Sequence, residues 1–294
     1  MKQSFLPIYN IHQFSFPIKE KDIYVEKVSE HLKKFKYVLE PHKHDFYFVV
    51  LCLKGSGTHT IDFIDYEIKP GYLFVMHPAQ THSLKLSEDA EGIVLMHSRD
   101  FYDLNFTSQK VKDFPFYCSM QNSPLIKLKE IKKVETHLLE LMNEYKGEDR
   151  MKYQKMACVI NILYIELIRI YLPDKPIEIK HQSYMVKIRQ LEDLIDTHFR
   201  TLKTPSDYSQ LMNVTEKHLN KICKESLNKT TSDMISDRII LEAKRLLVYG
   251  DRTGSEVSGE LGYFDNSYFS RLFKKKTGET PLEFIKKYHL KIKR

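Results

Sequence analysis

DNSYFSRLFKKKTGETP, residues Asp265 to Pro281, is the most informative segment of this 294-residue chain. Three apolar side chains, Phe269, Leu272 and Phe273, recur at i, i+3 and i+4, which predicts a helix with one buried face. The opposite face carries two hydroxyls, one Arg, one Lys and no acid: Ser267, Ser270, Arg271 and Lys274. Short hydroxyl side chains permit close approach to a surface, Arg can bond guanine, and Lys can contact phosphate. For an isolated segment, a solvated basic helix end is the simpler interpretation.

The same arrangement occurs a second time, closer to the N-terminus. Its apolar positions are Leu219, Ile222 and Cys223. Its outward positions, in the same register, are Lys217, Asn220, Lys221 and Lys224. One basic helix is common, but two in one register predict a duplicated DNA-reading unit.

Further motifs accompany these helices: Leu261-Gly262-Tyr263, Thr277-Gly278 with Thr280-Pro281, and RIILEAKRLL at residues 238–247. Together with Ser267 to Lys275, they resemble the C-terminal signature of the AraC/XylS family of transcriptional regulators. The resemblance extends over about Tyr184 to Tyr288. It implies two helix-turn-helix units joined by one helix, and it favours an activator that works with RNA polymerase. No residue distinguishes an activator from a repressor.

Charge is distributed unevenly along the chain. The formal net charge is +7, and residues 184–294 carry +6 of it, with 21 Lys+Arg against 15 Asp+Glu. A one-sided basic excess fits a polyanionic partner. An acidic membrane surface would fit equally, but the two basic helix faces favour double-stranded DNA.

The cysteines, Cys52, Cys118, Cys158 and Cys223, are widely spaced and form no CxxC pair. This pattern predicts reduced thiols in the cytoplasm. The N-terminus lacks an apolar signal core, and the most apolar run, Ala157 to Ile165, is too short to span a bilayer. We therefore expect a soluble cytoplasmic protein without a membrane partner.

Residues 37–106 read as β-structure. The run Phe46 to Leu53 and the segments Thr58 to Ile61 and Tyr72 to Met76 are separated by turn signals at Gly55-Ser56-Gly57 and Pro70-Gly71. Several short strands with regular turns predict a sandwich or small barrel. The sequence PHKH at 41–44, with the glycines and PAQTH at 78–82, resembles the cupin barrel that often precedes this DNA-binding domain.

Histidines His42, His44 and His82 are the candidate effector-binding residues. His42 and His44 are two apart and would share one face of a strand. A metal-binding cupin normally adds a Glu shortly after the His pair, and residues 46–49 contain none. Three imidazoles can still hold zinc. A small-effector pocket and plain hydrogen-bonded histidines at a barrel mouth are both compatible with this pattern, and we predict no metal or other cofactor.

Two amphipathic helices are expected after the β-region, over Leu125 to Tyr145 and Lys152 to Leu172. Ile162 and Ile165 widen the apolar face of the second helix. One helix would cover the barrel, and the second suggests a homodimer contact, although both could simply complete the core. Pro173 to Ser183 is expected to be a linker, because two prolines interrupt the helix.

The predicted fold is α+β and multidomain. Its parts are a cupin-like sensor domain at 1–120, a helical dimerisation segment at 121–172, a linker at 173–183 and an all-α double helix-turn-helix domain at 184–294. Thr204-Pro205, Thr253 and Thr280 are expected to start helices through N-caps, and Gly262 to adopt positive φ.

The second unit departs from the family pattern at Gly254, Ser258 and Gly259. A glycine inside a helix costs about 1 kcal/mol relative to alanine, and the hydroxyl of Ser258 needs a backbone acceptor. We therefore expect this unit to be marginally stable and to order fully on DNA.

The expected reading residues are Lys217, Asn220, Lys221, Ser267, Ser270 and Arg271. Lys224, Lys274 and Lys275 are expected at phosphates, and Asn266 at the backbone or a base edge. No catalytic motif stands out, so we expect no enzymatic activity. The alternative is a metal-dependent cupin enzyme with an appended helical domain. A third possibility is a regulator without a ligand, whose barrel serves only dimerisation.

Overall fold

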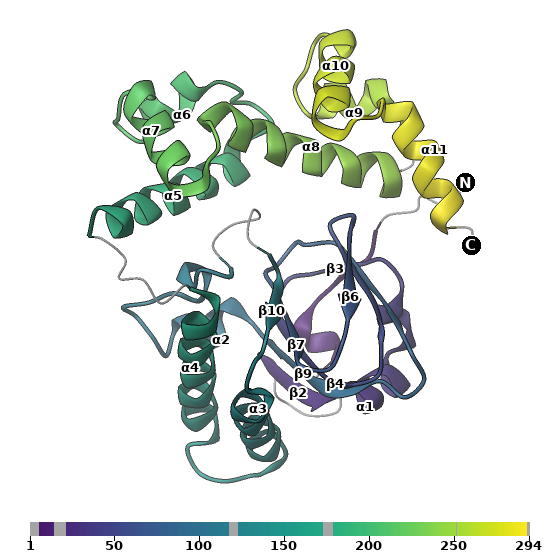
Figure 1. Ribbon diagram of the computed structural model, residues 1–294, viewed down its shortest axis with the longest axis vertical. Helices are drawn as coiled ribbons and strands as arrows, with labels where there is room; N and C mark the ends of the chain where they lie inside the picture. Colours follow the sequence, from purple (N-terminus) through teal and green to yellow (C-terminus); the bar gives the residue numbers. More distant parts are fainter. Residues whose placement is uncertain (1–5, 15–21, 118–122, 173–178, 251, 293–294) are drawn as a thin grey trace. The chain divides into compact units, whose positions relative to one another are not determined.

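The computed structural model describes residues 6–14, 22–117, 123–172, 179–250 and 252–292 (Figure 1). It contains two compact units, an N-terminal one at Pro7–Lys175 and a C-terminal one that includes Pro176–Arg294. Each unit has its own core. The predicted linker falls partly outside the described residues, at 173–178, and so does Cys118. The rest of the predicted linker, residues 179–183, is wrong, because these residues belong to a helix that begins at Ile179.

Two antiparallel sheets form the N-terminal unit. The larger sheet has the order β10 (Leu125–Lys127), β7 (Tyr72–Met76), β4 (Tyr47–Lys54), β9 (Glu91–His97) and β2 (Ile23–Lys27). The smaller sheet has the order β6 (Ile64–Ile68), β5 (Gly57–Ile61) and β8 (His82–Leu86). A short parallel pair joins β1 (Ile8–Tyr9) to β3 (Lys43–His44).

The predicted strands are confirmed, because β4, β5 and β7 coincide with the three runs identified in the sequence. Strand β4 is buried at six consecutive positions, as expected for a central strand covered on both faces. Among the described residues the two sheets are not joined into one closed ladder, and an isolated bridge links His82 of β8 to His42, the residue before β3. The β-rich domain is thus present, with separate sheets in place of a continuous barrel.

The helices of this unit are α1 (Val28–Lys34), α2 (Arg99–Asp103), α3 (Ile131–Lys146) and α4 (Lys152–Tyr171), with short 3-10 turns at Ile11–Gln13, Lys36–Leu39 and Val111–Asp113. Helix α4 begins where predicted. The expected helix from Leu125 is wrong in its first turn, since Leu125–Lys127 pairs with β7 as strand β10. The i, i+3 spacing of Leu125 and Leu128 suggested a helix, but the pairing of Leu125 with Phe74 and of Ile126 with Leu73 makes this segment a strand, and α3 begins only at Ile131.

A buried polar network fixes α4 on the larger sheet. Tyr164 of α4 lies with its hydroxyl 2.5 Å from Nε2 of His97 on β9 and 3.1 Å from the hydroxyl of Tyr117. The other ring nitrogen of His97 donates to the carbonyl of Ser98 at 2.8 Å. Burial lowers the pKa of His97 to about 4, so the imidazole is neutral at pH 7. On the outward face of α4, the side chain of Ile162 is 46% exposed and that of Ile165 is 38% exposed.

The C-terminal unit is entirely helical in its described residues. Its helices are α5 (Ile179–His198), α6 (Pro205–Leu211), α7 (Glu216–Leu227), α8 (Thr231–Tyr249), α9 (Gly254–Glu260), α10 (Asn266–Thr277) and α11 (Pro281–Ile292). Figure 1 shows α6 and α7 toward one end of α8, and α9 and α10 toward the other. This is the predicted arrangement of two helix-turn-helix units joined by one helix.

The predicted helix starts at Thr204, Thr253 and Thr280 are confirmed, and the structure adds a further one at Thr230. Thr204, Thr230 and Thr253 each form a capping box, in which the hydroxyl accepts from the N3 amide and the N3 carboxylate accepts from the cap. Thr280 makes the same reciprocal bonds with Glu283. These local bonds satisfy backbone amides that a helix cannot satisfy within itself.

The turn of the second unit requires glycine at Gly262. Its φ is +78°, and a Cβ at this position would lie 2.1 Å from the carbonyl oxygen of Arg200. The turn of the first unit uses Asn213 with φ 51° at the corresponding place. Asparagine and glycine are the residues that adopt this left-handed conformation most readily.

Candidate nucleic-acid interface and effector cavity

In the first reading helix, α7, one face is fixed in the core and the other is free. Leu219, Ile222 and Cys223 are fully buried, as predicted. Thr215 caps the helix and accepts from the amide of His218. The opposite face places three lysines in solvent: Lys217, Lys221 and Lys224. The ammonium of Lys221 lies 3.8 Å from Glu225, an exposed pair of small energetic weight.

Asn220 occupies a different role from its three basic neighbours. It is half-buried, and its amide oxygen accepts a hydrogen bond of 3.2 Å from the backbone amide of Thr231, the first residue of α8. Asn220 therefore ties the first reading helix to the connecting helix. Only its remaining amide hydrogens could face a base.

The second reading helix, α10, is built in the same way. Phe269 and Phe273 are fully buried, and Leu272 is half-buried. Asp265 caps the helix by accepting from the amide of Ser267. Tyr263 lies against Phe269, with ring centroids 5.6 Å apart. The outward residues are exposed, except Ser270, which is half-buried: Ser267, Ser270, Arg271, Lys274 and Lys275.

Two of the predicted readers in α10 already have partners within the chain. The side-chain amide of Asn266 donates to the hydroxyl of Ser255 at 2.6 Å, which links α10 to α9. The guanidinium of Arg271 lies 4.0 Å from the carboxylate of Asp265, and Arg271 is 73% exposed. The contact of Arg271 with Asp265 is weak enough to be exchanged for a contact with DNA, whereas the shorter hydrogen bond to Ser255 holds Asn266 in place.

Reasoning from sequence missed Lys276 as a structural residue. It follows Lys274 and Lys275 in a run of three lysines, but its ammonium donates to Asp233 at 2.8 Å and to Asp237 at 2.9 Å on α8. Hydrogen bonds from Lys276 and Thr230 hold the pKa of the Asp233 carboxyl well below its usual range. Helical spacing could have indicated this role, because Lys276 follows the buried Phe273 by three residues and therefore lies on the inward side of α10.

A second ionic cluster holds α5 against α8. Arg238 donates to Asp196 at 2.6 Å and to Glu242 at 3.1 Å, and its guanidinium stacks over Phe199 at 4.0 Å from the ring centroid. Glu242 also lies 3.6 Å from Arg200 and from Arg245. These ion pairs hold α8, the connecting helix, rigidly against α5.

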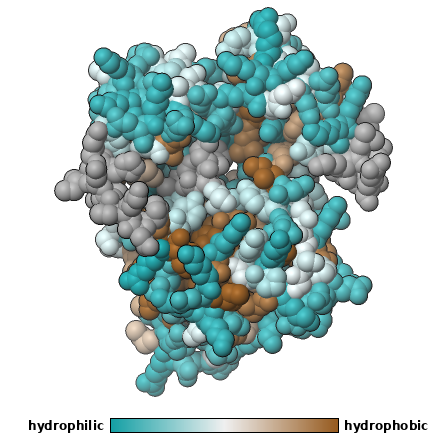
Figure 2. Space-filling model, in the orientation of Figure 1, coloured by the Kyte–Doolittle hydropathy of each residue, from teal (hydrophilic) through white to brown (hydrophobic). Residues whose placement is uncertain are grey.

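The surface of the first unit is polar. In Figure 2 the visible surface over α6 and α7 is mainly hydrophilic, as expected for a face that contacts a polyanion.

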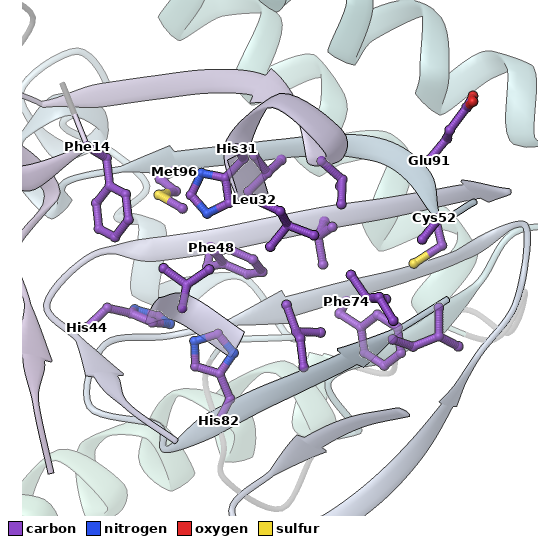
Figure 3. A pocket seen from close by; sticks show the side chains of 18 of the residues that line it. Phe14, His31, Leu32, His44, Phe48, Cys52, Phe74, His82, Glu91 and Met96 are labelled. Atoms are coloured by element: carbon purple, nitrogen blue, oxygen red, sulfur yellow. The ribbon is translucent and has the colours of Figure 1, made fainter. Parts of the chain in front are cut away.

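The candidate effector site is a narrow cavity in the N-terminal unit, between the two sheets. It is tightly closed in this structure: about 30 Å³ is open to the centres of water-sized molecules, within about 670 Å³ of unfilled space that includes open solvent. Its walls are mainly aliphatic and aromatic, with Phe48, Phe74 and Met96 among them (Figure 3). Figure 3 shows His31, His44 and His82 toward one end, and Cys52 and Glu91 toward the other.

The three predicted histidines lie together at this cavity. The ring centroids of His42 and His82 are 4.1 Å apart, and those of His44 and His82 are 5.1 Å apart. Burial lowers the pKa of His42 to about 4 and that of His44 to about 3. Burial likewise lowers the pKa of His82 well below its ordinary value. All three imidazoles are therefore neutral at pH 7.

A fourth histidine, His59, was missed. Its Nε2 lies 3.0 Å from Nδ1 of His82, and burial lowers its pKa to about 3. His59 alternates with Thr58 and Thr60 along β5, so the two-residue period of a strand could have placed it inside. Within the described part of the chain, no group of three or more His, Cys, Asp or Glu is arranged to hold a metal ion.

Comparisons with known protein families match both units. An AraC-like ligand binding domain matches residues 23–99, and a helix-turn-helix domain matches residues 208–287. Together the two matches cover more than half of the chain. Among the described residues, no helix has both the length and the apolar character needed to cross a bilayer.

Curated relatives match most of the length of this chain. The transcriptional activator Btr of Bacillus subtilis is 25% identical over 92% of this chain and 50% of its own length, so this chain spans about half of Btr. The activator RhaR of Escherichia coli is 22% identical over 84% of this chain and 87% of its own length. Among solved structures, ToxT of Vibrio cholerae covers 90% of this chain and 98% of that chain, with 13% identity and a TM-score of 0.44. The chain belongs to the AraC family of helix-turn-helix transcriptional regulators.

Proposed function

We propose that this chain activates transcription in the cytoplasm by placing α7 and α10 in successive major grooves of double-stranded DNA. The observation that carries the proposal is the pair of basic helices, exposed in the same register and joined by one helix. Helix α8 has 19 residues, which gives a length of about 28 Å at 1.5 Å per residue. Major grooves on one face of DNA recur about every 34 Å, so a rigid connector of this size suits two adjacent grooves.

The outward residues divide by chemistry. Arg271 can bond a guanine through two parallel hydrogen bonds, and Ser267 and Ser270 allow α10 to approach the bases. Lys217 and Lys221 take the corresponding positions on α7. Phosphate contacts would fall to Lys224, Lys274 and Lys275, near the ends of the two helices. Asn220 and Asn266 support this surface chiefly through their bonds to Thr231 and Ser255.

The N-terminal unit would supply control. Its cavity would bind a small effector near His42, His44 and His82. The relatives Btr and RhaR are named as activators, which supports an activating role with RNA polymerase as partner.

We also propose a homodimer through α4. The outward face of this helix presents Cys158, Ile162 and Ile165 at i, i+4 and i+7. An exposed apolar stripe on an otherwise covered helix favours a second copy of the same helix. Cross-linking of the purified Cys118→Ser protein with a short bismaleimide tests this, because Cys158 is exposed while Cys52 and Cys223 are buried. Cross-linked dimers should form, and they should be lost in Cys158→Ser and weakened in Ile162→Glu. The absence of cross-linked dimers at micromolar protein concentration would contradict the dimer.

Selection of binding sites from a random duplex library, at a stated salt concentration, tests the central proposal. Two enriched boxes about one helical turn apart, 10–10.5 base pairs from centre to centre, are expected. A single box would mean that only one unit reads bases. The absence of any enrichment, with and without a metabolite extract as an effector source, would contradict sequence-specific DNA binding.

A further inference from the structure

The tautomers of two cavity histidines are fixed by the backbone. Nδ1 of His44 lies 2.7 Å from the carbonyl oxygen of Phe46, and Nδ1 of His42 lies 2.8 Å from the carbonyl oxygen of Glu40. A carbonyl oxygen can only accept, so each Nδ1 must carry the hydrogen. In a neutral imidazole the other nitrogen is then a lone-pair acceptor. Nε2 of His42 and Nε2 of His44 are therefore both acceptors.

One of these acceptors is buried without a partner. Nε2 of His44 has no hydrogen-bond partner in the described part of the chain, and His44 is 1% exposed. Nε2 of His82, 3% exposed, lacks a partner as well. A buried polar atom left unpaired costs free energy. Both histidines line the cavity, so a molecule inside it could satisfy them.

The charges around the cavity argue against an anion at this end. Among the described lining residues, Lys54 is the only Lys or Arg. It pairs across the sheet with Glu91, and its ammonium lies 3.8 Å from Asp89. In Figure 3, Glu91 lies at the end of the cavity opposite to His44 and His82. A carboxylate beside His44 would meet a neutral acceptor and no cation.

We propose that the effector is a slender, mainly apolar, uncharged molecule whose polar end donates an O–H or N–H hydrogen to Nε2 of His44. The proposal deepens the effector role suggested above and rests on it. The aliphatic and aromatic walls hold the body of the molecule through burial of apolar surface. The unpaired Nε2 of His44 selects a donor over an acceptor, because an acceptor would leave this nitrogen unsatisfied.

The tautomers can be measured directly on the full-length protein, without any ligand. Long-range ¹H–¹⁵N correlation spectra at pH 7.5 should show His42 and His44 protonated at Nδ1 and bare at Nε2. Assignment would come from His42→Phe and His44→Phe. Protonation at Nε2 in both residues would overturn the proposal.

Ligand selectivity tests the same inference with three matched probes. Calorimetric titration with 1-octanol should give a Kd about tenfold or more below that of 2-octanone, which only accepts, and of octanoate, which is an anion. In His44→Phe the preference for 1-octanol over 2-octanone should disappear while both still bind. His77→Phe, a change at a histidine that does not line the cavity, should keep the preference.

Other outcomes separate this inference from the proposed function. Octanoate binding as tightly as 1-octanol would overturn the donor rule, and so would stoichiometric Zn²⁺ binding that perturbs the His42 and His44 signals. If none of the three probes binds, the inference fails as well. In each of these cases two selected DNA boxes would still support the regulator. Failure of the DNA selection with a clear octanol preference would instead remove the regulator and leave the ligand site.

Discussion

The two reading units present equivalent surfaces on unequal supports. Helices α7 and α10 are both 12 residues long, and the supporting helices α6 and α9 are both seven. In the first unit the hydroxyl of Ser209 donates to the carbonyl of Ser206 at 2.9 Å. In the second, the hydroxyl of Ser258 at the matching position is buried without a partner among the described residues. The reading face is repeated, but the packing beneath it is not.

Glycine adds to this inequality. Helix α9 begins at Gly254 and contains Gly259, whereas α6 begins with Pro205 and has Gln210 at the position of Gly259. Gly259 has open space around it, so no close approach requires a glycine there. Gly262 differs, because the turn next to Arg200 accepts only glycine. The second unit therefore combines one indispensable glycine with one that only weakens a helix.

The largest expected effect comes from the turn. Gly262→Ala should destabilise the second unit by about 3 kcal/mol or more, because it adds left-handed strain to an overlap with Arg200. Asn213→Ala, the matched change in the first unit, should cost about 1–2 kcal/mol. Urea denaturation of both variants measures the difference. Equal losses would show that the two turns are equally constrained.

Base reading should differ between matched positions. Arg271→Ala should relax the preference at one base pair by about 1–3 kcal/mol, and Lys221→Ala should change it less, because a lysine lacks the bidentate fork. Lys274→Ala should weaken all sequences and reduce the salt slope by about one. Competition binding with single-base operator variants at several salt concentrations reports both quantities. If Arg271→Ala and Lys274→Ala behave alike, the division into base and phosphate contacts is wrong.

The serine pair should give effects of opposite sign. Ser258→Ala should stabilise the protein by about 1 kcal/mol, because it removes an unsatisfied buried hydroxyl. Ser209→Ala should instead lose about 0.5–1 kcal/mol, since it deletes a formed hydrogen bond. Thermal and urea unfolding of the two variants measures both changes in the free energy of unfolding. Stabilisation by both substitutions would mean that the hydrogen bond of Ser209 does not contribute to stability.

Gly259→Ala should stabilise α9 by about 0.5–1 kcal/mol through helix propensity. Gln210→Ala, the matched substitution in α6, should be nearly neutral. Hydrogen exchange gives the local measurement. In the parent protein the amides of α9 should exchange faster than those of Ile235 to Leu247, and Gly259→Ala should slow them. Equal protection of the two segments would refute the marginal stability expected for the second unit.

A further expected effect concerns the pH dependence of stability. Lys203 lies over the ring of Tyr263 at 5.2 Å, and burial lowers its pKa from 10.5 to about 8. Between these values the unfolded chain binds more protons than the folded one, so stability should rise with pH from about 8 to 10.5. Lys203→Met should remove this rise. The test is to measure unfolding midpoints of the parent protein, Lys203→Met and the control Lys286→Met across this pH range. The rise should be lost in Lys203→Met and kept in Lys286→Met.

Local features of the fold could be predicted because their causes are local. The threonine caps, the glycine turn and the buried faces of α7 and α10 each depend on residues a few positions apart. Strand β10 could not be predicted, because its identity depends on pairing with β7, far away in sequence. Lys276 was missed for the same reason, since its partner Asp233 is 43 residues away.

The candidate site shows the same limit. Periodicity placed Asn220 on the outward face of α7, but the residue is half-buried, and its bond to Thr231 depends on where α8 begins. Spacing brought His42 and His44 together on one strand, and only the structure shows His59 beside His82. Which nitrogen of each ring is available depends on backbone carbonyls that no spacing reveals. The contacts with DNA stay predictions.

The stiffness of α8 has a consequence for promoter evolution. A single inserted base pair between the two boxes would move the second box by about 3.4 Å and rotate it by about 35° around the DNA axis. Lys276 of α10 holds the second unit to α8 through Asp233 and Asp237, so this unit cannot follow such a rotation without breaking those ion pairs. Operators should therefore drift freely by base substitution inside each box, whereas insertions and deletions between the boxes should be purged by selection.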